Sequence, residues 1–306
     1  MKTNKTYFVL AVLGLSFLLI VACKNSTDDT ETILTGQAAI LVDESIFPIV
    51  EDQQAVFETQ YQAKLTLMKK SESEIVNALL NDSIKIAVLP RKLSNGENNL
   101  LSNKKINPKQ TLFAKDAVVF ITNKASNDTL ISLEDLVSFL NGKEVKGIKG
   151  LVFDNPNSSS VRLLSEKVGV KIASQKNVFS FATNIEVIKY VAENEGMIGV
   201  IGINWLYQPP LIMQATVDKV QLMSVQADKD KGYIYPSQLN IGKGFYPLAR
   251  HLYIINCQGY SGLGMGFASF IGGERGQRIV LKSGLVPVRY PSRNIITRKN
   301  ILNEKK

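Results

Sequence analysis

The chain has 306 residues, of which 45% are hydrophobic and 21% charged, a globular composition with enough apolar side chains for a core. Its length predicts about two domains. The net charge of +9 favours acidic partners, but the lysines and arginines are scattered instead of forming blocks with aromatic residues, which argues against nucleic-acid binding. With one histidine and two cysteines there is no cluster for a zinc site, and we expect neither a metal nor a cofactor.

Residues 1–22 predict a lipoprotein signal peptide. Lys2 and Lys5 form a basic start, and residues 7–22 are mostly apolar but too short and wrongly flanked for a membrane span. The run ends in Leu-Ile-Val-Ala before Cys23, which resembles the lipobox of bacterial lipoproteins. The resemblance implies cleavage before Cys23, a lipid such as palmitate on it, and a lipid-anchored protein of the cell envelope that faces the periplasm. A plain signal peptide or an uncleaved anchor is the alternative.

The second cysteine, Cys257, then has no partner for an intrachain disulfide and is most simply a buried small hydrophobe. Residues 23–35 are polar and predict a flexible tether between the lipid and the fold.

Strand and helix patterns alternate through the rest of the chain. Strands are predicted at 38–42, 63–67, 84–89, 113–122, 151–153, 178–181, 196–202 and 246–256, with a weaker pattern at 220–225. Helices are predicted at 46–61, 71–81, 132–140, 158–168, 183–194, 262–272 and 275–283. Residues 94–110 are predicted to be a loop with weak helical character, residues 233–244 a loop, and the basic tail after Val288 irregular. The alternation predicts an α/β fold with mainly parallel sheets.

Three consecutive serines, Ser158, Ser159 and Ser160, follow a short strand and a polar turn and would open a helix. The first turn of a helix has unpaired backbone N–H groups and the positive end of the helix dipole. These hydroxyls and the nearby guanidinium of Arg162 could complete a pocket for a small oxyanion. An ordinary N-cap is the alternative, and on local grounds the more frequent one.

Two further strands end in polar corners. Ser45 follows the first strand and precedes Pro48, so its hydroxyl would face a helix N-terminus; a capping role is an equal alternative. Arg91 follows the third strand at its carboxyl end, where open α/β sheets bind ligands, although a single arginine there is more often a solvated loop charge.

Several short motifs, in this order along the chain, resemble the periplasmic phosphate-binding proteins of ABC transporters. They are Leu34-Thr35-Gly36 with Ser45-Ile46-Phe47-Pro48, residues 87–93, 115–120 and 158–160, Gly196-Met197-Ile198-Gly199, residues 246–250, and Gly276-Gln277 with 282–287. The resemblance implies a two-lobed periplasmic-binding-protein (type II) fold, with mixed, mainly parallel sheets, a two-stranded hinge and the anion in the cleft. Lobe 1 would take 36–122 and 236–306, and lobe 2 would take 123–235.

The resemblance also implies site residues. Ser45 and Phe47 would give hydroxyl and backbone N–H contacts to phosphate, and residues 158–160 stand where the family usually has Ser-Gly-Thr. A serine at 159 departs from that pattern, because glycine lets the backbone approach an anion closely.

Two charged positions are exchanged relative to the family. This chain has Arg91 where the family commonly has an acid, and Asp154 where it commonly has an arginine. Our hypothesis is that one cation and one carboxylate survive with their lobes swapped, and that Arg162 is a second cation. The carboxylate would accept the proton of monohydrogen phosphate, which fully ionised sulfate lacks.

These features predict a monomeric, lipid-anchored component of an ABC phosphate importer, with inorganic phosphate, the permease subunits and the membrane as partners. A surface lipoprotein on the same scaffold that binds another oxyanion, a protein or a glycan is the alternative. An enzyme has less support: His251 is the lone histidine, in an apolar strand pattern, and residues 259–263 miss the last glycine of a nucleophile elbow. Glycines 262, 264 and 266 have the wrong spacing for a dinucleotide site and predict close helix packing.

Overall fold

The computed structural model describes residues 31–172 and 176–292. The predicted signal peptide, Cys23, most of the predicted tether and the end of the basic tail lie outside the described residues. None of the helices within the described ranges combines the length and apolar character that a membrane crossing requires.

A curled sheet of ten strands runs through the molecule in the order β2-β1-β3-β11-β4-β8-β6-β7, with β12 and β9 also paired to β4. Its strands are β1 (Thr35–Asp43), β2 (Gln62–Lys70), β3 (Ile86–Leu89), β4 (Lys109–Asn123), β6 (Gly150–Phe153), β7 (Val178–Ser180), β8 (Met197–Gly202), β9 (Val220–Leu222), β11 (Ala249–Asn256) and β12 (Val286–Pro287). A second, small sheet pairs β5 (Leu130–Ser132) with β10 (Ser224–Gln226). Strands β1, β2 and β3 are parallel, as are β6, β7 and β8, whereas β4 and β11 run antiparallel to their neighbours.

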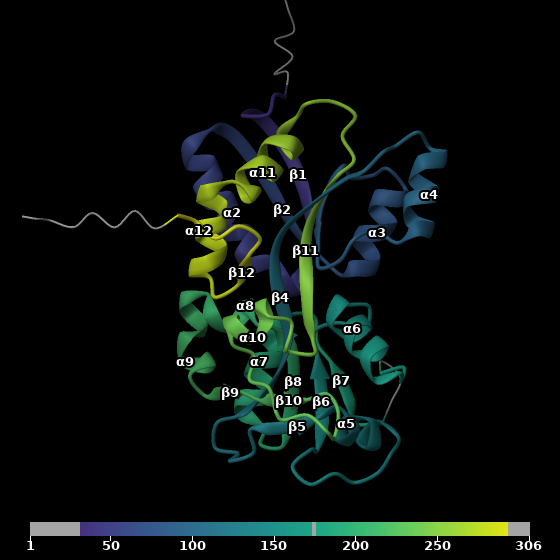
Figure 1. The fold of residues 1–306 in the computed structure, drawn as a ribbon, viewed down its shortest axis with the longest axis vertical. Coiled ribbons are helices and arrows are strands. Elements are labelled where there is room, and N and C mark those ends of the chain that lie inside the picture. The colour runs from purple at the N-terminus through teal and green to yellow at the C-terminus, as the bar shows by residue number, and fades with distance from the viewer. Residues whose placement is uncertain (1–30, 173–175, 293–306) are drawn as a thin grey trace, which may run out of the picture.

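The sheet divides into two lobes, one above the other in Figure 1. Lobe 1 contains β1, β2 and β3 with α2 (Phe47–Gln60), α3 (Glu72–Leu80), α4 (Asn95–Asn103), α11 (Leu263–Gly272) and α12 (Glu274–Lys282). Lobe 2 contains β6, β7 and β8 with α5 (Leu133–Leu140), α6 (Ser159–Val168), α7 (Asn184–Glu193), α8 (Asn204–Tyr207) and α9 (Gln214–Val217). Helix α10 (Gln238–Gly242) packs against β12 and β4, and Gln238 donates to the Leu281 and Leu285 carbonyls at the end of α12. Two 3-10 turns are η1 (Glu44–Ile46) and η2 (Leu211–Met213).

Strands β4 and β11 connect the two lobes. Strand β4 pairs with β11 up to Ala117 and with β8 from Val118 onward, so one continuous strand belongs to both lobes. The predicted two-lobed α/β fold with mixed, mainly parallel sheets is therefore confirmed. The exact lobe boundaries drawn from the sequence stay a prediction.

The central strands form because their side chains are apolar on both faces. Every residue of β3, β6 and β8 is buried, as expected of inner strands that have helices on both sides. In lobe 1, α2 and α11 pack on one face through Phe57 and Phe267, whose rings lie 5.3 Å apart. Helices α3 and α4 cover the opposite face.

Two helices lie where the sequence predicts loops, the first of them in the segment with weak helical character. Helix α4 buries one residue, Leu101, so it lacks the apolar period that predicts a helix. It begins instead with a capping box formed by Ser94 and Glu97. Helix α10 has five residues and begins at the N-cap Ser237.

Candidate functional site

Two serines from different lobes meet one buried arginine where the lobes join. Ser45 lies in η1 at the end of β1, Ser159 is the first residue of α6, and Arg250 comes from β11. The guanidinium Nη2 donates to Ser45 Oγ and Nη1 donates to Ser159 Oγ, both at 2.9 Å. The two hydroxyl oxygens are 3.1 Å apart. Donors from both lobes and from the strand between them thus converge on one point.

A buried carboxylate holds Arg250 in this position. Asp116 on β4 lies opposite Arg250 in the strand register, and its Oδ2 accepts from Nε at 3.0 Å and from Nη2 at 2.7 Å. Both side chains are almost fully buried, so each charge needs the other. Burial raises the pKa of Asp116, and the neighbouring Arg250 opposes this effect.

A second carboxylate, Asp43, closes the group on the other side. Its Oδ1 accepts from the Ser45 backbone N–H at 3.0 Å, from Ser45 Oγ at 2.5 Å and from Ser159 Oγ at 3.0 Å. Burial raises the pKa of Asp43 to about 6, although Arg250 and the Ser45 hydroxyl oppose the shift. We call these five residues, Asp43, Ser45, Asp116, Ser159 and Arg250, the junction cluster.

Two more acids lie beside the junction cluster. Asn184, the first residue of α7, donates from its backbone N–H to Glu44 Oε1 at 3.0 Å. Its side-chain amide donates to Glu44 Oε2 and, at 3.2 Å, to Asp154 Oδ2. Burial and the nearby Asp154 raise the pKa of Glu44 to about 8, so this carboxyl is largely protonated at neutral pH. Burial also raises the pKa of Asp154, while its hydrogen bond with Ser158 opposes the rise.

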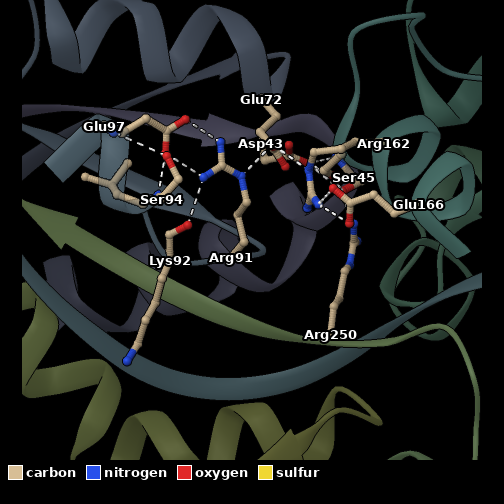
Figure 2. Close-up of polar contacts among 12 residues, drawn as sticks. Asp43, Ser45, Glu72, Arg91, Lys92, Ser94, Glu97, Arg162, Glu166 and Arg250 are labelled. Atoms are coloured by element: carbon tan, nitrogen blue, oxygen red, sulfur yellow. Dashed lines mark hydrogen bonds and ion pairs between the residues drawn. The ribbon is translucent and has the colours of Figure 1, made fainter. Parts of the chain in front are cut away.

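The arginines predicted to bind the ligand are held by carboxylates (Figure 2). Arg91 donates to Glu72 at 2.7 Å and to both oxygens of Glu97 at 2.8 Å. Arg162 donates to the same Glu72 oxygen at 2.7 Å and to Glu166 at 2.8 and 2.9 Å. Glu72 lies between the two guanidinium groups, so the contact between Arg162 and Glu72 joins lobe 2 to lobe 1.

The structure brings some of the predicted residues together and leaves others apart. Ser45 and Ser159 meet as described above, whereas no hydrogen bond among the described residues joins Arg91 to Asp154. Ser158 caps α6 by accepting a hydrogen bond from the Val161 N–H, so this serine has the N-cap role given above as the alternative to ligand binding.

The other two predicted residues are also buried. The hydroxyl of Ser160 finds no hydrogen-bond partner in the described part of the chain. The ring of Phe47 lies under Lys69 Nζ, 4.2 Å from its centroid.

Asp43, Asp116 and Arg250 are missing from the residues predicted to form the site. Arg250 and Asp116 each lie within a strand pattern that is otherwise largely apolar. A charge in a buried strand needs a partner, so the sequence could have indicated that Arg250 and Asp116 pair with each other. Asp43 lies at the end of a buried strand, two residues before Ser45, and this position could have marked it as a candidate site residue.

A cavity of about 220 Å³ opens beside the junction cluster. The N-cap residues of three helices line it: Ser71 of α3, Ser158 of α6 and Thr183 of α7. The other charged residues that line it are Lys69, Lys70, Asp43, Glu44, Glu74 and Asp154. Helix N-termini and lysines favour an anion here, and the carboxyls favour one that carries a proton.

Comparisons with known proteins give a consistent result. The domain model of the PBP superfamily matches residues 27–275. The chain is 25% identical over 299 residues to the phosphate-binding protein PstS of Borreliella burgdorferi. The alignment covers 92% of this chain and 98% of that protein.

Solved structures resemble the fold. One is a putative phosphate ABC transporter substrate-binding protein with bound phosphate from Clostridium perfringens, with 20% identity, a TM-score of 0.69, and coverage of 83% of this chain and 100% of that one. Another is an ABC-type phosphate transport receptor from Vibrio cholerae, with 16% identity, a TM-score of 0.61, and coverage of 82% and 100%.

Proposed function

Because the chain belongs to the PBP superfamily, we propose that it binds inorganic phosphate between its lobes as the solute-binding component of an ABC transporter. A relative that is named as a phosphate-binding protein and aligns with 92% of this chain supports the proposal. Homologues of this kind are transport proteins and not enzymes. Attachment through a lipid on Cys23 and docking on permease subunits belong to the same proposal.

The single observation that carries the proposal is the convergence of Ser45, Ser159 and Arg250 from both lobes and the connecting strand. An oxyanion needs several donors in a site that excludes water, and hydrogen bonds to a charged acceptor are the stronger ones. The N-termini of α3, α6 and α7 at the adjacent cavity add positive potential. A phosphate ion that contacts both lobes would hold them closed.

Asp154 is the proposed acceptor for the phosphate proton. Its Oδ1 is buried without a partner among the described residues, and the side chain lines the cavity. An unpaired buried carboxylate oxygen gains a hydrogen bond from a protonated oxyanion and repels one without a proton. Arg91 and Arg162 stay predicted ligand residues, but each would have to release a carboxylate to reach the ion.

Titration calorimetry with phosphate and sulfate tests the proposal, using the chain and two matched variants. Ser159→Ala removes a hydrogen bond to a charged ligand, and we expect it to weaken phosphate binding by about tenfold to a hundredfold. Ser165→Ala, on the same helix but outside the junction cluster, should bind like the parent chain. Absence of phosphate binding by the parent chain would overturn the proposal, and stronger sulfate binding would point to another oxyanion.

A further inference from the structure

Asp43 accepts hydrogen bonds from the same two serines that carry the proposed phosphate site. Arg250 can only donate hydrogen bonds, so Ser45 and Ser159, which accept from it, have their single hydroxyl protons available for another acceptor. Both hydroxyls lie within hydrogen-bond distance of the same oxygen, Asp43 Oδ1, which also accepts the Ser45 backbone N–H. A carboxylate of the chain itself therefore takes up the donors that would hold an oxyanion.

The charges within the junction cluster point the same way. Arg250 is already neutralised by Asp116 at 2.7 Å. With Asp43 ionised, the three side chains carry a net charge of −1, and with Asp43 protonated they carry none. A phosphate anion that approaches the two serines thus meets repulsion from Asp43 in a buried setting, where such repulsion is poorly screened.

The adjoining cavity gives the carboxylate a place to go. Asp43 is part of both the junction cluster and the cavity wall, and its second oxygen, Oδ2, is buried without a partner among the described residues. A rotation about the side-chain bonds toward the cavity would release both hydroxyls without moving the backbone.

We propose that Asp43 is an internal competitor of the ligand, a carboxylate that phosphate must displace from Ser45 and Ser159 before it can bind. This inference rests on the proposed function and adds a specificity-determining residue to it. Phosphate affinity is then lower than the donor set alone would give, and it depends on the protonation state of Asp43.

The expected pH dependence follows from the surroundings of Asp43. The charged groups that face it or the adjoining cavity are Arg250 on β11, Asp116 on β4, Glu72 and Glu74 on α3, Asp154 after β6, Glu44 in η1, and Lys69 and Lys70 on β2. Burial, the largest effect, raises the pKa of Asp43 to about 6. Below that pH the side chain is neutral and competes weakly. As the pH falls, the phosphate affinity of the parent chain should therefore approach that of a chain in which residue 43 carries no charge.

A simpler role for Asp43 is that of N-cap of η1, through its bond from the Ser45 N–H. That role accounts for one of its three hydrogen bonds and does not explain the contact with Ser159 across the lobes. The two roles can be separated, because asparagine is as good an N-cap as aspartate and has nearly the same shape. Asp43→Asn keeps the cap and removes the charge.

The experiment is phosphate titration of the parent chain, Asp43→Asn and Asp52→Asn at several pH values between about 5 and about 8. Asp52 on α2 is the matched control, because burial also raises its pKa to about 6 and it lies outside the junction cluster. At the highest pH we expect Asp43→Asn to bind phosphate about tenfold or more tightly than the parent chain. The ratio of the two phosphate affinities, Asp43→Asn over the parent chain, should fall toward one at the lowest pH. The ionisation of phosphate itself affects both proteins equally and cancels from this ratio.

Asp52→Asn should match the parent chain at every pH. Equal or weaker phosphate binding by Asp43→Asn at the highest pH, or a ratio that does not change with pH, would overturn the inference while leaving the proposed function intact. If the parent chain does not bind phosphate at any pH, the proposed function itself fails.

Discussion

Four buried carboxyl groups lie near a single guanidinium where the lobes join. Asp43 and Asp116 contact Arg250 or its serine partners, and Glu44 and Asp154 share the amide of Asn184. Burial raises the pKa of all four. One arginine cannot balance four charges, so the folded protein keeps part of this group protonated, and its stability must depend on pH.

Glu44 should make the protein less stable in mildly alkaline solution. Its pKa rises from 4.5 to about 8 on folding, so the folded state binds the proton more tightly than the unfolded state between these values. The stabilising contribution is complete below the lower value and is lost progressively as the pH rises from there through about 8, with a slope of up to about 1.4 kcal/mol per pH unit. Glu44→Gln, which resembles the neutral acid, should lack this loss.

Urea denaturation at a series of pH values measures the effect. Glu193→Gln, an exposed change at the end of α7, serves as control and should keep the slope of the parent chain. If the stabilities of Glu44→Gln and the parent chain change in parallel between pH 4.5 and about 8, folding does not raise the pKa of Glu44.

Two of the three donor side chains at the site could be predicted from the sequence. Ser45 and Ser159 could be predicted because each lies in a polar turn between a buried strand and a helix, and strand ends and helix starts are local sequence patterns. The pairing of Arg250 with Asp116, 134 residues earlier, depends on the register between β11 and β4, which no local pattern specifies. The same holds for Asp43, whose contact with Ser159 exists only once the lobes meet.

At the scale of elements, sequence periodicity identified the apolar helices and strands and missed the polar ones. Helix α5 was predictable because it buries Leu133, Leu136 and Leu140 at helical spacing. Helix α4 has almost no buried face, so its formation depends on capping, which Ser94 and Glu97 provide in the same Ser-x-x-Glu pattern as Ser71 and Glu74 of α3. Reading that pattern alone would have found α4.

The packing of α11 allows a test with two glycines on one helix. A Cβ on Gly266 would lie far too close to the Ile33 backbone carbonyl, so Gly266→Ala must push α11 away from the start of β1 and should destabilise the protein by about 1–3 kcal/mol. Gly272, at the end of α11, has no neighbouring atom within 4 Å of an added Cβ. Gly272→Ala should therefore raise stability by about 0.5–1 kcal/mol.

Chemical denaturation of both variants measures the two changes. The opposite signs are the informative result, because helix propensity alone would make both substitutions stabilising. A stable Gly266→Ala variant would mean that α11 and residue 33 are not in close contact.

At the scale of the whole molecule, side chains on both lobes hold them together. The amide of Asn204 on lobe 2 accepts the Ile49 N–H of α2 at 2.6 Å, and Trp205 Nε1 donates to the Glu44 carbonyl at 3.1 Å. Arg162 and Glu72 add an ion pair across the lobes. These contacts set how readily the lobes separate when no ligand is bound.

Removing the ion pair should favour separated lobes. Arg162→Gln leaves Glu72 with Arg91 alone, so the loss should be about 1 kcal/mol or less, and the ratio of closed to open molecules should fall by up to about fivefold. Small-angle scattering without phosphate should then give a larger radius of gyration. Arg278→Gln breaks an ion pair within α12 and is the matched control. Identical scattering from both variants would show that the pair does not hold the lobes.

The continuity of β4 limits how these lobes can move. At the crossing point the Val118 N–H bonds the Leu248 carbonyl, and the Ile203 N–H bonds the Ala117 carbonyl, so the ribbon is paired on both sides of the junction. Sliding would break those pairs, whereas twisting along the ribbon would preserve them. We therefore expect opening to be a torsion about one long axis, in which an arginine fixed to that axis hardly changes place while the two serines swing past it.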